Sequence, residues 1–164
     1  MIKPLFQRVI VAVNGSAASL HAAMYGILMA KTYHCNLKVV YVVDTATIKQ
    51  LMMSKFLLSD EGSSTETALE NDGNRNLQYV LDLAKSKGVK IETELRKGSV
   101  WSEIITAADE YKADLILLGG QAPSNTSSII RNELSMENRS IIGSAHCSVL
   151  VVNEQYIEQM FKLA

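Results

Sequence analysis

The sequence predicts a three-layer α/β domain: a doubly wound, five-stranded parallel sheet with helices on both faces. Two observations lead to this prediction. Short apolar runs with the length of strands alternate along the chain with segments of helical periodicity, the order found in parallel sheets joined by right-handed crossovers. Two of the runs, 8–13 and 37–43, are almost continuously apolar, as expected for strands that are covered on both faces.

The length and composition fit one such domain. The chain has 164 residues, of which 48% are hydrophobic and 20% charged, and its formal net charge is −1. A charge so close to zero gives no field that would attract nucleic acid or an anionic membrane surface. No apolar run reaches the roughly 20 residues of a membrane helix, and the start lacks a signal-peptide cleavage site. We therefore expect a single cytoplasmic domain over 1–164, with a core at about 6–153 and a helical tail at 154–164.

The first strand and helix follow from local sequence. The strand over 8–13 ends at Asn14-Gly15-Ser16, a turn sequence. A helix is then expected to begin at a cap formed by Ser16 or Ser19. The side chains at helical spacing on its inward face are Leu20, Ala23, Met24, Ile27 and Leu28. The second strand, 37–43, follows.

The segment from Asp44 to Asp72 is less regular. The piece IKQLMMSKFLL predicts a short helix, and the polar piece SDEGSSTE predicts a loop. We expect the apolar side chains of the first piece to pack against the sheet; a lid over a pocket or a partner surface is the alternative. These side chains are Met52, Met53, Phe56, Leu57 and Leu58.

A second long helix is expected from about Thr65 to Lys87, ended by Gly88. Its inward side chains are predicted to be Leu77, Val80, Leu81 and Ala84. The third strand, 90–95, alternates in hydrophobicity, which favours a place near the sheet edge. The helix over 99–112 that follows should direct Trp101, Ile104, Ile105 and Ala108 inward. The remaining elements are expected to be a strand at 114–118, a helix at 137–145, a strand at 149–152 and a helix at 156–163.

Two strand ends carry residues suited to a ligand. Doubly wound sheets bind ligands at the carboxyl ends of their strands, close to the point where the strand order reverses. Asn14-Gly15-Ser16 and Gly119-Gly120 both follow strands. Asn14-Gly15-Ser16 is either part of a nucleotide site or a turn that caps a helix. Gly119-Gly120 is either part of that site or a turn that allows close packing. Hydroxyls and amides from Ser124, Asn125, Thr126, Ser127 and Ser128, with Arg131 or Arg139, could hold phosphate, or form only a surface loop.

Metal and catalytic constellations are not predicted. His21, His34 and His146 show no metal-ligand spacing. Cys35 and Cys147 are far apart in sequence, and we expect two buried thiols rather than a disulfide. No Ser-His-Asp or Cys-His set is apparent. We therefore expect no metal and, at most, a weak ATPase.

Three stretches resemble the universal stress protein family in their order and spacing. RVIVAVNGSAAS is similar to the first strand and Val-Asp-Gly-Ser turn of the family, with Asn14 at the Asp position, and LKVVYVVD is similar to its second strand. The block from KGSVWSEIITAADEYKADLILLGG to IIGSAHCSVLVV resembles its last strands and closing Ala-x-Cys-x-Val-Leu-Val-Val. The resemblance spans most of 8–152 and implies the fold already predicted, also described as nucleotide α-hydrolase-like.

The resemblance also implies which ligand to consider. Members that bind ATP carry Gly, two residues, Gly, nine residues, Gly and then Ser or Thr after the fourth strand. Here Gly119 matches the first glycine, but the other positions fall on Ala122, Ser135 and Met136, and the loop is longer. The residues implied for adenine-nucleotide contact are Asn14, Gly15 and Ser16 at the ribose, the Val42 and Val43 backbone at the adenine, and Gly119, Gly120, Gln121, Ser135 and Met136 at the phosphates.

The expected function is therefore a cytoplasmic stress-response binding or signalling module with a degenerate adenine-nucleotide site, which works by dimerising and by contacting unidentified protein partners. The resemblance implies a homodimer paired through the last strand, Val149–Val152. The alternative is a genuine ATP- or AMP-binding member with slow hydrolysis at most. For that alternative we expect Gly119→Val to abolish nucleotide binding and leave the fold intact. A related enzyme is disfavoured because the first strand lacks a Ser-Gly-Gly-x-Asp-Ser loop.

Overall fold

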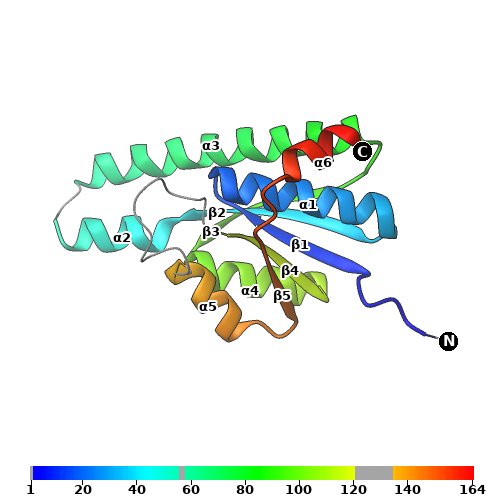
Figure 1. Ribbon diagram of the computed structural model, residues 1–164. Coiled ribbons are helices and arrows are strands. Elements are labelled where there is room, and N and C mark those ends of the chain that lie inside the picture. The colour runs from blue at the N-terminus through cyan, green and yellow to red at the C-terminus, as the bar shows by residue number, and fades with distance from the viewer. Residues whose placement is uncertain (1, 56–57, 121–134) are drawn as a thin grey trace, which may run out of the picture.

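The computed structural model describes residues 2–55, 58–120 and 135–164. Within these residues a five-stranded parallel sheet in the order β3-β2-β1-β4-β5 lies between two layers of helices (Figure 1). The strands are β1 (Arg8–Val13), β2 (Asn36–Asp44), β3 (Glu92–Gly98), β4 (Leu115–Gly119) and β5 (Ser148–Val152). β2 and β3 lie on one side of the central strand β1, and β4 and β5 lie on the other side. The predicted doubly wound fold is therefore confirmed.

The helices divide between the two faces of the sheet. One layer consists of α1 (Ala17–Tyr33), α3 (Ser59–Ser86) and α6 (Ile157–Leu163), and the other of α4 (Val100–Tyr111) and α5 (Met136–Ser144) (Figure 1). Val9 and Val11 of β1 lie in the core beneath the first layer. Ile10, between them in sequence, lies in the core beneath the second. Because successive strand side chains point to opposite faces, both sets are buried, which explains the continuously apolar strands.

The segment between β2 and β3 differs from the prediction. A short helix, α2 (Thr45–Met53), is present as expected, but α3 begins at Ser59 rather than near Thr65. The polar piece SDEGSSTE is therefore helical. Its first turn is supported by the Glu61 carboxylate, whose Oε2 accepts a hydrogen bond from the Leu58 backbone N–H at 3.1 Å. The piece is polar because this part of α3 lies beyond the sheet, where it has solvent rather than core around it (Figure 1).

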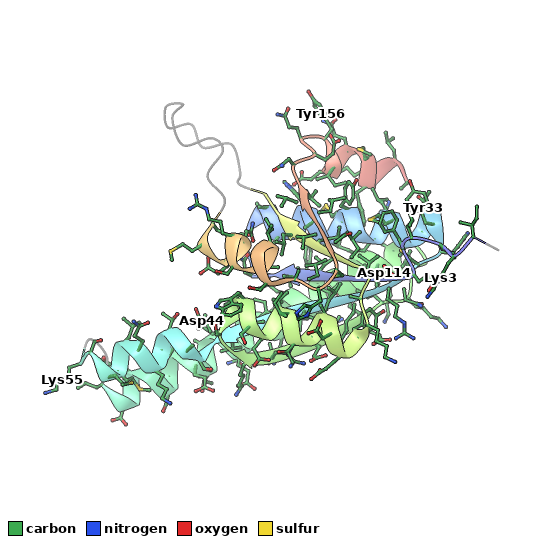
Figure 2. The ribbon with its side chains drawn as sticks, turned by 90° about the horizontal axis from the view of Figure 1, so that it is seen from below. Lys3, Tyr33, Asp44, Lys55, Asp114 and Tyr156 are labelled. Carbon is green, nitrogen blue, oxygen red and sulfur yellow. The ribbon has the colours of Figure 1, made fainter. Side chains whose placement is uncertain are left out.

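α2 and the first turns of α3 together form a helical hairpin that projects past the sheet, with Asp44 at its base and Lys55 at its tip (Figure 2). Within it, Met52 lies against Gly62 of α3. Met53 and Leu58 remain exposed, at 76% and 70%. The prediction that the apolar side chains of this segment pack against the sheet is therefore wrong for these two residues. Phe56 and Leu57 lie outside the described residues.

β3 is the edge strand that its alternating sequence predicts, although it lies at 92–98 rather than 90–95. It reaches Gly98 because its register with β2 continues to the pair Asp44 and Gly98. Its polar side chains are paired with neighbouring elements: Arg96 Nε donates to Glu103 Oε2 of α4 at 2.8 Å. On α4 the buried stripe contains Ile104, Ala107, Ala108 and Tyr111. Trp101 lies in the first turn of α4 and is 41% exposed, so the prediction that it faces inward is wrong.

Candidate functional site

A cleft of about 600 Å³ opens at the carboxyl edge of the sheet. It lies where β1 and β4 are neighbours and the chain leaves these two strands toward opposite layers, the place expected for a ligand in a doubly wound sheet. Side chains and backbone from β1, β2, β4, α1, α4 and α5 contribute to its described lining. Its size falls within the range of small-molecule sites.

The turn between β1 and α1 is held by its own hydrogen bonds. Asn14 Oδ1 accepts from the Ser16 backbone N–H at 3.0 Å, and Ser16 Oγ accepts from the Ser19 N–H at 3.1 Å. The buried Ser19 hydroxyl accepts from the Asn14 N–H at 3.1 Å and donates to the Ser16 carbonyl at 3.0 Å. Ser16 is therefore the cap of α1. The carbonyl oxygen of the Asn14 side chain serves the turn, which leaves its NH₂ group as the donor that can face a ligand.

The end of β4 passes very close to the first turn of α1. A Cβ placed on Gly119 would lie 2.5 Å from the carbonyl carbon of Ala18 and 2.7 Å from the Ser19 nitrogen. The Gly120 N–H donates to the Val152 carbonyl at 3.0 Å, which continues the pairing of β4 with β5. The expectation that Gly119→Val leaves the fold intact is therefore wrong, since the missing side chain is what allows α1 to contact β4.

The beginning of α5 forms the opposite wall of the cleft. Ser135 is its cap, because Ser135 Oγ accepts from the Asn138 N–H at 3.1 Å. The Asn138 side chain donates from Nδ2 to the Gly119 carbonyl at 2.9 Å and so ties α5 to the end of β4. Ser135, Glu137 and Asn138 all line the cleft. The N-termini of α1 and α5, which carry partial positive charge, thus converge on one space.

The structure brings together six of the ten residues predicted for the site. The cleft is lined by Asn14, Ser16, Val42, Gly119, Gly120 and Ser135. Three others lie outside the described lining. Gly15 has a φ of +85° and lies against Asn76 of α3, the Val43 side chain is buried in the α1–α3 layer, and Met136 is 81% exposed. Arg139 is exposed and does not line the cleft.

The remaining predicted positions fall outside the described residues. These are Gln121, Ala122, Ser124 to Ser128 and Arg131. Sequence reasoning also missed residues that do line the cleft, above all Ala17, Ser19, Glu137 and Asn138. Their place in the first turn of a predicted helix could have identified them, because the first turn of a helix that follows a strand in this fold faces the carboxyl edge of the sheet.

Titratable groups away from the cleft serve local contacts. His21 Nε2 lies 3.0 Å from Glu158 Oε1 and joins α1 to α6, and His146 Nδ1 lies 3.0 Å from Asp109 Oδ1. Both cysteines are free thiols, and burial raises the pKa of the Cys35 and Cys147 thiols. Among the residues that the structure describes there is no group of three or more side chains able to hold a metal ion. Nor does any helix in these ranges have the length and apolar character needed to cross a membrane.

Comparison with known proteins agrees with this architecture. The model of the universal stress protein family matches residues 5–153. A universal stress protein of Methanocaldococcus jannaschii, MJ0531, is 33% identical over 153 residues, which cover 92% of this chain and 84% of the relative.

Solved structures share the fold. A universal stress protein family member from Burkholderia pseudomallei superposes with a TM-score of 0.70 at 22% identity, covering 93% of this chain and 100% of the other. A universal stress protein in complex with cAMP superposes with a TM-score of 0.59 at 23% identity, covering 90% of this chain and 96% of the other. A universal stress protein family member from Arabidopsis thaliana with AMP bound superposes with a TM-score of 0.60 at 14% identity, covering 89% of this chain and 90% of the other. The parallel sheet, the cleft at its reversal point and the match over nearly the whole chain lead to one conclusion: this protein belongs to the universal stress protein family.

Proposed function

We propose that this protein is a cytoplasmic stress-response module that binds an adenine nucleotide in the cleft between β1 and β4, and acts through that binding rather than through catalysis. The observation that carries the proposal is the cleft itself, which unites the ends of β1 and β4 with the first turns of α1 and α5. Structures with the same fold have been obtained with cAMP and with AMP. Those ligands are properties of the other proteins and support the choice of ligand class here.

The residues present fit a nucleoside carrying phosphate. Val42, Val100, Ile104 and Leu118 supply an apolar part of the cleft suited to a base. We assign the NH₂ group of Asn14, which lines the cleft, as the donor to a ribose oxygen. Near Gly119, the converging N-termini of α1 and α5 favour an anionic group.

The site departs from the ATP-binding pattern of the family and is in that sense degenerate. Ser135 stands where the pattern has a glycine, and its hydroxyl already accepts the Asn138 N–H that would otherwise be free for phosphate. The described lining includes neither a histidine nor a lysine, and Glu137 is the carboxylate among those residues. This composition favours binding over hydrolysis.

Ala17→Phe is expected to weaken adenine-nucleotide binding by at least about tenfold, because the ring would occupy the cleft from an exposed position at the start of α1. The measurement is calorimetric titration with AMP, cAMP and ATP, each with and without Mg²⁺, on protein first freed of carried-over nucleotide. Ala46→Phe, which adds the same ring to the exposed side of α2, should bind like the wild type. If the wild-type protein binds none of the three at millimolar concentration, the proposal is wrong.

We further propose that the protein is a homodimer paired through β5. β5 is the last strand of the sheet, and among the described residues its ladder partner is β4 alone. The Val152 carbonyl points toward β4, where it accepts from Gly120. Since peptide groups alternate along a strand, the N–H and C=O of Val151 point toward the open edge.

Val151→Pro is expected to convert the dimer to a monomer and leave the fold intact, since proline is tolerated in an edge strand where its missing N–H faces outward. Light scattering coupled to size-exclusion chromatography measures the change in mass. Val152→Pro is the matched control, because its N–H lies on the β4 side, and that variant should instead lose several degrees in Tm. A Val151→Pro protein that keeps the dimer mass would contradict pairing through this edge.

A further inference from the structure

The methionines that the structure describes differ in how far solvent reaches them. Met24 and Met29 are buried in the core beneath α1. Those with exposed side chains are Met53, Met136 and Met160. Met52 belongs to neither group, because it is half-buried at the contact between α2 and α3. Solvent therefore reaches a methionine on which a contact between two helices depends.

The Met52 thioether lies against Gly62 of α3. Its sulfur is the nearest atom to a Cβ placed on Gly62, and its Cγ and Cε would lie 3.0 Å and 3.4 Å from that Cβ. The bare glycine thus allows the end of the Met52 side chain to lie directly on the α3 backbone. Ile48, one turn earlier on the same face of α2, is 5% exposed. Met52 and Ile48 are the side chains through which α2 packs onto the protein.

α2 depends on this packing to remain a helix. It has nine residues, fewer than the roughly 12 to 15 that an isolated helix needs in water. Asp44 caps its N-terminus, where Oδ1 accepts from the Thr47 N–H at 3.0 Å. Its contacts with other elements are chiefly with α3, in the hairpin that projects past the sheet (Figure 2). A change at Met52 therefore acts on an element that cannot hold its structure alone.

We propose that Met52 is an oxidation switch: conversion of its thioether to the sulfoxide by a peroxide releases α2 from α3 and opens the hairpin. The peroxide transfers an oxygen atom to Sδ. A sulfur lone pair forms the S–O bond, the peroxide O–O bond breaks and, when the oxidant is hydrogen peroxide, water leaves. The inference goes beyond the proposed nucleotide site and does not rest on it.

The sulfoxide opposes the contact for two reasons. It adds an oxygen at the atom that already lies against Gly62, and it turns an apolar side chain into a polar one. Overpacking and loss of apolar contact both favour the released state. Methionine sulfoxide reductases return the sulfur to the thioether, so the switch is reversible.

The test treats the whole protein with hydrogen peroxide and follows two quantities in the same samples. Peptide mass spectrometry gives the sulfoxide content of each methionine, and hydrogen exchange gives the protection of the α2 amides. We expect exchange in α2 to accelerate by at least about tenfold as Met52 is oxidised, while the sheet strands keep their protection. Treatment with methionine sulfoxide reductases of both stereospecificities should restore the slow exchange.

Met52→Leu and Met53→Leu are the matched variants, because leucine is close to methionine in volume and has no sulfur to oxidise. Met53→Leu should open on oxidation as the wild type does. Met52→Leu should stay closed although its Met53 is oxidised. Met52→Gln, polar and of similar length, should open α2 without oxidant, whereas Met53→Gln should not. Thermal unfolding of each untreated variant checks that the rest of the fold is retained.

Three results would each overturn the inference. In the first, Met52 is converted to the sulfoxide and the exchange of the α2 amides does not change. In the second, the Met52→Leu protein opens on oxidation as far as the wild type. In the third, Met52 is oxidised no faster than the buried Met24 and Met29, which would show that peroxide does not reach the α2–α3 contact.

Discussion

Gly119→Val is expected to lower the free energy of unfolding by about 3 kcal/mol or more, and to reduce the yield of folded protein accordingly. Even the first carbon of the new side chain would lie 2.5 Å from the Ala18 carbonyl carbon and 2.6 Å from its oxygen. These are backbone atoms in the first turn of α1, so no side-chain rotation relieves the overlap. Either α1 must shift off the sheet or β4 must bend, and both movements disturb buried strand residues such as Leu117 and Leu118.

Urea denaturation followed by circular dichroism measures this loss, and Gly143→Ala is the control. A Cβ on Gly143, inside α5, would have no heavy atom within 4 Å, so that substitution should be neutral or stabilise by up to about 1 kcal/mol through helix propensity. A Gly119→Val protein as stable as the wild type would show that α1 and β4 can separate. If the variant is destabilised, its failure to bind nucleotide says nothing about direct ligand contact, which is why Ala17 is the better probe of the cleft.

Gly73→Ala is expected to destabilise the protein by about 1 to 2 kcal/mol, although helix propensity alone predicts a gain of about 1 kcal/mol. Gly73 lies in the middle of α3, where the helix contacts the sheet. A Cβ there would be 2.6 Å from Leu95 Cδ1 and 2.6 Å from Tyr41 Cδ1. Tyr41 is 6% exposed, so its ring has little room to move, and the cost of overpacking exceeds the propensity gain.

Thermal and urea unfolding again supply the measurement, with Gly143→Ala as a substitution of the same type in a helix without the close contact. The two variants should shift stability in opposite directions. If both substitutions raised the stability equally, α3 would have to lie further from the sheet than its contacts with Tyr41 and Leu95 indicate. A combined variant, Gly73→Ala with Leu95→Ala, should recover part of the overpacking loss, because it removes one of the two overlapping side chains.

The two glycines explain how the architecture positions the cleft. Gly119 allows the first turn of α1 to lie directly on the end of β4, which brings the Ser16–Ser19 cap beside Ser135 and Asn138 of α5. Gly73 seats α3 against β2 and β3 on the same layer as α1. Gly119 packs against the backbone of α1, and Gly73 packs against the side chains of Tyr41 and Leu95.

Local sequence was enough to predict most of the elements because their signals are short-ranged. The buried strands are apolar on both faces, Ser16 caps the helix that follows its turn, and the alternation of IETEL indicates an edge strand. The errors occurred where burial is set by distant partners. SDEGSSTE predicts a loop because a helix without a core-facing stripe lacks periodicity, and helical spacing alone predicts that Trp101 faces inward; the structure shows a helix and an exposed ring.

By itself, then, the sequence determined the fold class, and it predicted a site at the carboxyl edge of the sheet whose residues include Asn14, Ser16, Gly119 and Ser135, all of which line the cleft. Hydrophobic periodicity and cap chemistry are properties of neighbouring residues, so they can be read without coordinates. Only the tertiary structure showed that the Val43 side chain is buried in the layer of α1 and α3 and that Gly119 packs closely against α1. It also showed that Glu137 and Asn138 line the cleft. Those facts depend on which elements meet in space, and β1 and β4 meet across about a hundred residues of intervening chain.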